Sequence, residues 1–375
     1  MTVLLWVVLT PLALCVAAVA LVFLVAIVRG LLRDVRTDPD TDATAARVAA
    51  LGLLPAERQH TELAAPLSPA LSVALVSARA GDWGPAAELL DATLEAGDWE
   101  GRSAFSERLA DLAAEEDGWL REWEEARPGD PGAALVRARG TVFLAWNVRG
   151  GARDEDTSPE QEEGFRRVLA RSREEHVRAV ALAPADDPSP YVAEIWTALG
   201  LGLPHEELRR LWREVVDRAP HHYEAHFAAL QYWCGKWSGS AELARAFAVR
   251  AAAGAPPGTL MTALPLIAHF EHDVSDSTDV DRTPEMFAAV DALLADVAAA
   301  DPAHPRLPEA RHLLAYYLWL QDRWEEAMGQ FRLVDGHVGA LPWRYKADPA
   351  EEFCRARDAC AEHVTGGESG PYPRR

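Results

Sequence analysis

The stretch Asp217–Gly258 decides the fold of this chain and reads DRAPHHYEAHFAALQYWCGKWSGSAELARAFAVRAAAGAPPG. Apolar residues in its first half recur at i, i+4, i+7 and i+11, which is one stripe of an α-helix: Tyr223, Phe227, Leu230 and Cys234. Gly235 interrupts this pattern, and a second stripe follows at Leu243, Phe247 and Ala251. Two helices joined by a glycine turn within about 36 residues are typical of a stacked helical repeat. The stretch therefore predicts one complete helical hairpin.

Prolines recur at a repeat-like interval on both sides of this hairpin. The spacings 220 − 184 and 256 − 220, between Pro184, Pro220 and Pro256, are both 36, close to the tetratricopeptide period of about 34 residues. No segment shows sustained two-residue alternation of a β-strand. We therefore predict an all-α fold, an irregular tetratricopeptide-like α-solenoid of helical hairpins over residues 67–345.

Several local patterns make sharper predictions within this region. Residues 101–125 predict one long helix, and Ser158-Pro159-Glu160-Gln161 predicts a helix start with a capping box. Pro265 lies inside an apolar helical pattern and predicts a kink. The acidic segment Asp273–Arg282 predicts a solvated loop, because its aspartates lack the spacing of a calcium-binding loop.

The N-terminal segment Thr2–Val28 is 27 residues without a charge. A helix of that length spans about 40 Å, enough to cross a hydrocarbon core of about 30 Å with some tilt. A cleaved signal peptide is the alternative, but no basic residue precedes the run and no A-x-A cleavage site follows it. Arg29, Arg33 and Arg36 come next, and arginines beside a span stay on the cytoplasmic side.

These observations predict four regions and a location. Residues 1–30 form a transmembrane anchor, 31–66 a juxtamembrane linker, 67–345 the helical-repeat domain, and 346–375 a C-terminal helix with a flexible tail. The protein is expected in the cell membrane as a single-pass protein whose C-terminal body is cytoplasmic.

The net charge argues against one class of partner, and the cysteine spacing argues against a disulfide. The 375-residue chain has a formal net charge of −21 at pH 7. A nucleic-acid partner is not expected, because phosphate binding requires a basic surface. Cys354 and Cys360 lie six residues apart and on one helix would point in different directions, so they cannot form a disulfide.

Two short motifs carry a resemblance to a known family. The motifs AWNVRGG at residues 145–151 and KWSGS at residues 236–240 resemble those of an uncharacterised bacterial domain-of-unknown-function family with tetratricopeptide-like helices. The resemblance covers roughly Leu71–Leu333, and Ser238 departs from the glycine that the family more often has there. It implies the helical-repeat fold and supplies no activity.

Histidines in the central hairpin suggest a second class of function. His222 and His226 at i, i+4 would suit a metal-dependent hydrolase, but Tyr223 between them departs from the H-E-x-x-H motif. His269 and His272 belong to the next repeat. They are offset by about 10 Å along the helix axis from the histidines of the central hairpin, which is too far to share one metal. We therefore expect surface histidines, no metal site and no cofactor, with a hydrolase at a His222/His226 surface as the alternative function.

A helical repeat array is a binding architecture, so the sequence favours a membrane-tethered scaffold for an unidentified protein or peptide over an enzyme. A purely structural membrane-associated spacer is a third class. Four residues at glycine-rich helix ends, where a groove can open, form the candidate partner-binding motif: Trp146, Arg149, Lys236 and Trp237. The alternative is a structural role. Trp237 would then pack near Tyr223 or Phe247, and Lys236 would reach the carbonyl end of the preceding helix.

Overall fold

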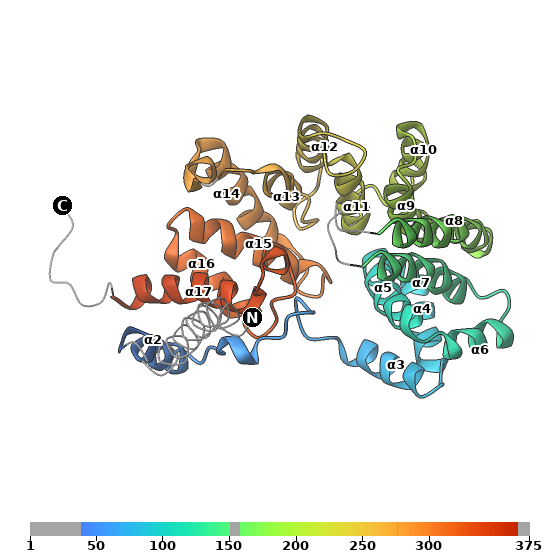
Figure 1. Ribbon diagram of the computed structural model, residues 1–375, viewed down its shortest axis with the longest axis horizontal. Coiled ribbons are helices and arrows are strands. Elements are labelled where there is room, and N and C mark those ends of the chain that lie inside the picture. The colour runs from blue at the N-terminus through green and yellow to red at the C-terminus, as the bar shows by residue number, and fades with distance from the viewer. Residues whose placement is uncertain (1–38, 151–157, 276, 367–375) are drawn as a thin grey trace, which may run out of the picture.

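The chain folds into α-helices joined by turns, which confirms the all-α prediction (Figure 1). The computed structural model describes residues 39–150, 158–275 and 277–366, and these form no β-strand. The first half contains α2 (Pro39–Ala50), α3 (Pro69–Arg79), α4 (Gly84–Ala96), α5 (Trp99–Glu115), α6 (Gly118–Ala126), α7 (Pro131–Arg149), α8 (Pro159–Leu182) and α9 (Ser189–Leu201). The second half contains α10 (His205–Val216), α11 (Tyr223–Trp233), α12 (Ala241–Ala253), α13 (Ala263–His272), α14 (Pro284–Ala299), α15 (Leu307–Leu320), α16 (Trp324–Val334) and α17 (Pro349–Gly366). The described residues also contain the short 3-10 helices η1 (Ala56–Arg58), η3 (Thr278–Arg282) and η4 (Trp343–Tyr345).

The helices form two layers along an arc. Each odd-numbered helix from α3 to α17 packs against the next odd-numbered helix. From α8 to α16, each even-numbered helix packs against a neighbour in the chain, and within the described residues it makes no comparable contact with the next even-numbered helix. Figure 1 shows α10, α12 and α14 along the outer edge of the arc. The odd-numbered helices therefore form a continuous inner layer, an arrangement compatible with helical repeats.

The central hairpin forms as predicted, with α11 and α12 as its two helices. Ser240 caps α12 by accepting a hydrogen bond from the Leu243 N–H at 3.2 Å. Gly239 is required in the turn, because a Cβ there would lie 1.9 Å from the Trp233 carbonyl oxygen. Of the predicted stripe of α12, Phe247 is buried and Ala251 packs against the core, whereas Leu243 is exposed and Ala244 is buried in its place.

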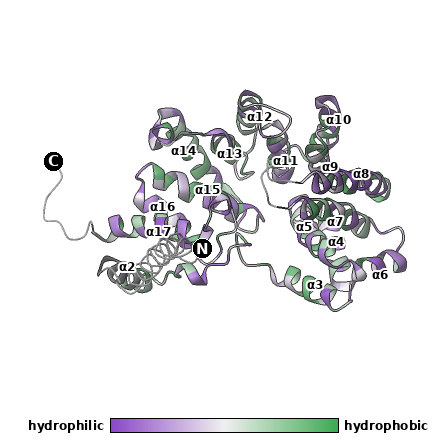
Figure 2. Cartoon of the chain, viewed as in Figure 1, coloured by the Kyte–Doolittle hydropathy of each residue, from purple (hydrophilic) through white to green (hydrophobic). Residues whose placement is uncertain are grey.

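Most helices carry hydrophobic and hydrophilic residues on different faces (Figure 2), as two-layer packing requires. The largest apolar cluster runs through α11, α13, α15, α16 and α17, with Trp343 and Phe353 among its fully buried side chains. A second cluster joins α3–α7 and centres on Trp119 and Trp123. The core is therefore a series of clusters between neighbouring helices rather than one compact centre.

Three local predictions are corrected by the structure. Residues 101–125 form two helices, because Glu116 adopts an extended backbone between α5 and α6. Pro265 lies in the first turn of α13, where backbone N–H groups have no intrahelical acceptor, so it causes no kink. Asp281 in the acidic segment is buried rather than solvated. The capping box at Ser158 is confirmed.

The beginning and the end of the described chain pack against each other. The backbone N–H of Leu54 donates to Asp335 Oδ2 at 2.7 Å, and the Leu54 carbonyl accepts from Arg357 Nη1 at 2.7 Å. Arg357 Nη1 also pairs with Asp335 Oδ1 at 2.6 Å, and the Arg357 side chain is fully buried. The segment assigned from sequence to a juxtamembrane linker thus contains α2 and η1, and both pack on α17. The C-terminal helix is likewise part of the packed domain.

The predicted anchor at Thr2–Val28, the charged loop at 151–157 and the tail after residue 366 lie outside the described residues. Among the helices that the structure describes, none has both the length and the apolar character needed to cross a membrane.

Removing the Arg357 charge should destabilise the fold strongly. Arg357→Met keeps the apolar volume but leaves Asp335 buried without its cation, which we expect to lower the free energy of unfolding by about 3–5 kcal/mol. Arg355→Met removes an exposed arginine two residues away and should cost less than about 1 kcal/mol. Urea unfolding of both variants measures the difference. Equal effects would show that the contact between the chain's two ends contributes little.

Candidate binding site

A cavity of about 710 Å³ lies on the inner layer of the arc. Its walls come from α5, α7, α9, α11 and α15, from the turn after α11, and from the segments at residues 61–62 and 339–345. Helices distant in the sequence therefore meet around one space. This volume falls within the range of about 300–1,000 Å³ that is usual for ligand pockets.

Aromatic side chains form one wall of the cavity. Trp146 from α7 and Trp237 from the turn after α11 meet edge to face, with ring centroids 5.6 Å apart. Trp196 from α9 and Phe227 from α11 lie beside them, with centroids 6.0 Å apart. All four rings are only partly buried, so each keeps part of its surface for contact with a ligand.

The structure brings together the four residues that the sequence singled out. Trp146, Lys236 and Trp237 line the cavity, and the guanidinium of Arg149 lies over the Trp146 ring at 5.7 Å from its centroid. The predicted neighbour of Trp237 was wrong, because Trp237 packs against Trp146 rather than near Tyr223 or Phe247. Whether these residues bind a partner stays a prediction.

The ammonium group of Lys236 contacts a neighbouring helix and not the carbonyl end of its own. Lys236 Nζ lies 2.7 Å from Glu271 Oε2 on α13 and 3.2 Å from the Tyr345 hydroxyl. Burial disfavours the charged ammonium, but the charges of Tyr345 and Glu271 outweigh this and raise the pKa of Lys236. Lys236 therefore stays charged and joins three elements at the rim of the cavity.

A largely buried cluster of arginines and glutamates forms another part of the cavity wall. Arg306 pairs with Glu107 on α5, with Glu309 at 2.9 Å and with Glu224 on α11 at 3.6 Å. Glu224 also accepts from Arg139 on α7 at 2.5 Å. Burial pushes the pKa of Glu107 upward, but the charges of Arg306, Arg139 and the adjacent Arg108 lower it to about 2. The Glu107 carboxylate is thus ionised, and arginines within the protein balance its charge.

Two other arginines at the cavity have no such partner. Among the described residues, the guanidinium groups of Arg108 on α5 and Arg344 in η4 make no ion pair with a carboxylate; Arg344 lies over the Tyr345 ring at 5.9 Å. Arg108 is half-buried and Arg344 is exposed. Although the chain has a net charge of −21, the cavity therefore offers two guanidinium groups that form no direct ion pair with a carboxylate of the described residues.

Sequence reasoning missed the arginine–glutamate cluster. Its members lie on four different elements, so no local spacing connects them. One signal was present, because Arg137 and Arg139 are the two charged residues in the otherwise nearly apolar helical segment 133–148. A charge within a buried helix requires a buried partner.

The prediction that His222 and His226 lie on the helix surface was wrong, because both are buried. His222 Nε2 lies 3.1 Å from Ser103 Oγ, and His222 Nδ1 accepts the Ala225 N–H as the cap of α11. His226 Nδ1 bonds the His222 carbonyl at 2.9 Å. Both ring nitrogens of His222 thus have protein partners.

Comparisons of the chain with protein-family models, with curated proteins and with solved structures found no match. The all-α fold therefore rests on the structure itself, and the resemblance to a tetratricopeptide-like family stays a prediction.

The buried histidines make stability depend on pH. Burial lowers the pKa of His226 to about 4 and that of His312 to about 4, whereas an exposed imidazole titrates near pH 6.5. The unfolded chain therefore binds more protons below pH 6.5, and stability present above that pH is lost as the pH falls toward 4.

We expect the free energy of unfolding to decrease from pH 7 to pH 5, with about 2 kcal/mol of the decrease due to His226. Urea unfolding of His226→Gln should show a correspondingly smaller decrease. His363→Gln, which alters an exposed histidine, should behave like the unmodified protein. An unchanged pH dependence in His226→Gln would contradict this assignment.

Proposed function

We propose that this protein is a non-enzymatic, membrane-tethered scaffold with tetratricopeptide-like helical repeats that binds a peptide segment of a partner protein in its inner cavity. The observation that carries the proposal is the cavity itself, which combines an aromatic wall with arginines that lack carboxylate partners. Helical-repeat arrays commonly bind partners along their concave surface.

The chemistry of the walls points to a segment with apolar or aromatic side chains and at least one carboxylate. Trp146, Trp196 and Trp237 offer indole faces and edges for apolar contact. Arg108 and Arg344 offer guanidinium groups that pair well with carboxylates. A cavity of about 710 Å³ holds a few side chains of such a segment rather than a folded domain.

The composition of the walls favours binding over catalysis. None of the described residues that line the cavity is a serine, cysteine or histidine, and three of its four glutamates, Glu107, Glu224 and Glu309, are paired with arginines. Nucleophilic catalysis requires a nucleophile within reach of a general base. The alternative hydrolase at His222 and His226 receives no support, because those side chains are buried and hydrogen-bonded.

A peptide array tests the binding proposal. Full-length protein should select peptides that combine Asp or Glu with Trp, Phe or Leu. Arg108→Gln should weaken the best of them about tenfold, because a charge-assisted hydrogen bond contributes about 1.5–3 kcal/mol. Arg245→Gln removes an exposed arginine from α12, outside the cavity, and should leave the affinity unchanged. Selection of basic peptides, or equal losses in both variants, would refute the proposal.

The membrane tether rests on the uncharged run at Thr2–Val28 and the arginines after it. A reporter that fluoresces only in the cytoplasm, fused after Arg375, should light up in a bacterial host. A dark fusion whose periplasmic counterpart is active, or a mature N-terminus near residue 30, would rule out this topology.

A further inference from the structure

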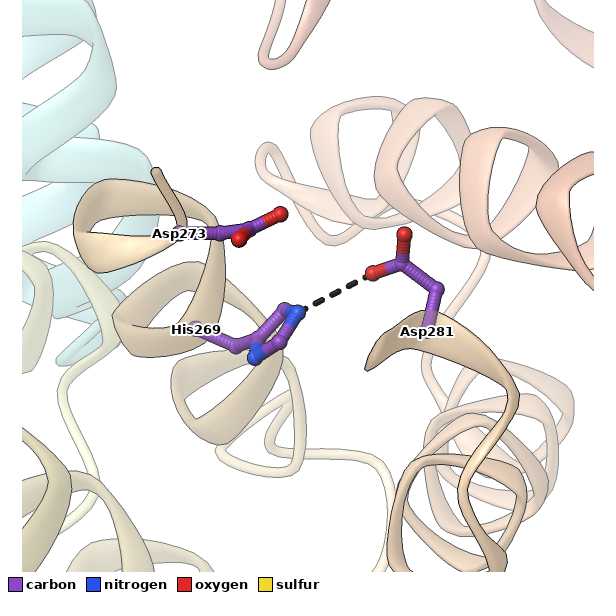
Figure 3. A group of neighbouring side chains, drawn as sticks. All are labelled: His269, Asp273 and Asp281. Atoms are coloured by element: carbon purple, nitrogen blue, oxygen red, sulfur yellow. Dashed lines mark hydrogen bonds and ion pairs between the residues drawn. The ribbon is translucent and has the colours of Figure 1, made fainter. Parts of the chain in front are cut away.

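Three side chains with metal-binding chemistry converge outside the cavity, where α13 ends (Figure 3). One nitrogen of His269 and one carboxylate oxygen each of Asp273 and Asp281 lie within 4.8 Å of one another. In Figure 3 the Asp273 carboxylate is directed towards the gap between His269 and Asp281. Two helical elements thus contribute donors to one small space.

Local structure explains why these side chains meet. His269 and the C-cap residue Asp273 are four residues apart, so both project from one face of α13. Asp281 belongs to η3, which is held against the end of α15. There the Gln321 Nε2 donates to the Asp281 carbonyl at 2.9 Å, and Arg282 Nε donates to the Leu320 carbonyl at 2.7 Å.

The distances suit a tetrahedral ion of small radius. His269 Nε2 and Asp281 Oδ1 are 3.0 Å apart, and two ligands of tetrahedral zinc, each at about 2.0–2.2 Å from the ion, are separated by about 3.3 Å. The Asp273 side chain is exposed at the end of α13, where its Oδ1 accepts the Ser275 N–H at 2.8 Å, and its carboxylate lies within 4.8 Å of the other two donors. One imidazole and two carboxylates leave a fourth position for water, as in zinc sites with three protein ligands.

The surroundings of the three donors favour a cation. The carbonyl end of α13 carries the negative end of the helix dipole. The basic side chain that follows Asp281 in the sequence is already engaged, because Arg282 pairs with Asp322 at 2.7 Å.

The burial of Asp281 distinguishes these three residues from the acidic residues of an ordinary solvent-exposed loop. Its residue is only 6% exposed, and among the described residues His269 is the one side chain that bonds its carboxylate. A buried carboxylate favours a cationic partner, and a metal ion held jointly with His269 would supply one.

We propose that His269, Asp273 and Asp281 bind a Zn²⁺ ion, with water in the fourth position. The mixed nitrogen and oxygen donor set selects zinc over Ca²⁺ and Mg²⁺, which take oxygen ligands and higher coordination numbers. The ion joins the end of α13 to η3 and stabilises the acidic segment between them. This proposal is independent of the binding proposed for the cavity.

Zinc titration of the metal-free full-length protein by calorimetry tests the assignment. We expect one Zn²⁺ per chain with a dissociation constant below about 10 μM, an increase in melting temperature, and no comparable response to Ca²⁺ or Mg²⁺. Cobalt in place of zinc should give the visible absorption of a tetrahedral site.

Asp273→Asn provides the sharpest variant, because this side chain is exposed and its loss leaves the core intact. It should weaken zinc binding at least tenfold while the melting temperature without zinc stays unchanged. Asp279→Asn, an exposed aspartate of the same segment, is the matched control and should bind zinc normally. Absence of zinc binding by the unmodified protein, or equal binding by Asp273→Asn, would overturn the proposal.

Discussion

The inner layer depends on charges that are buried and must therefore be paired. Arg306 precedes α15 and contacts Glu107, which lies 199 residues earlier on α5; through Glu224 it also connects to Arg139 on α7. Removing Arg306 would take away the ion-pair partner of Glu107, and a charge left unpaired in a low-dielectric interior is strongly destabilising. The free-energy cost of separating these charges therefore fixes α5, α7, α11 and α15 relative to one another.

The positions of the aromatic side chains in the cavity wall depend on this pairing of charges. Trp146 lies on α7, the helix of Arg139, and Phe227 lies on α11, the helix of Glu224. Once the charged cluster fixes those helices, the indole of Trp146 meets Trp237 and that of Trp196 meets Phe227. The Trp196 Nε1 also donates to Glu224 at 3.2 Å, which ties the aromatic wall directly to the charged one. A ligand would therefore meet a preorganised surface, which lowers the entropic cost of binding.

Local sequence predicted the helices better than it predicted what they bring together. The hairpin of α11 and α12 and the capping box at Ser158 depend on residues close in the chain, so spacing and capping rules were sufficient. The Arg306 cluster depends on residues from four elements, and no local pattern specifies which charge meets which. The sequence also misplaced His222 and His226, because helical spacing locates a side chain on a helix but does not say which faces a neighbouring helix covers.

Lys236 is a single-residue example of a contact that local sequence does not predict. Its rarity in an arginine-rich chain marked it from sequence, but its partner is Glu271, which lies 35 residues further on and whose side chain is 3% exposed. A compact ammonium can approach Glu271 and the Tyr345 hydroxyl together, whereas the planar fork of a guanidinium needs a wider arrangement of acceptors. Glu271 also accepts from Gln231 at 2.9 Å, and the Gly235 N–H donates to His272 at 3.1 Å, so several contacts join the rim of the cavity to α13. The choice of lysine is therefore explained by packing between elements, and a partner contact would be made by the part of the side chain that remains exposed.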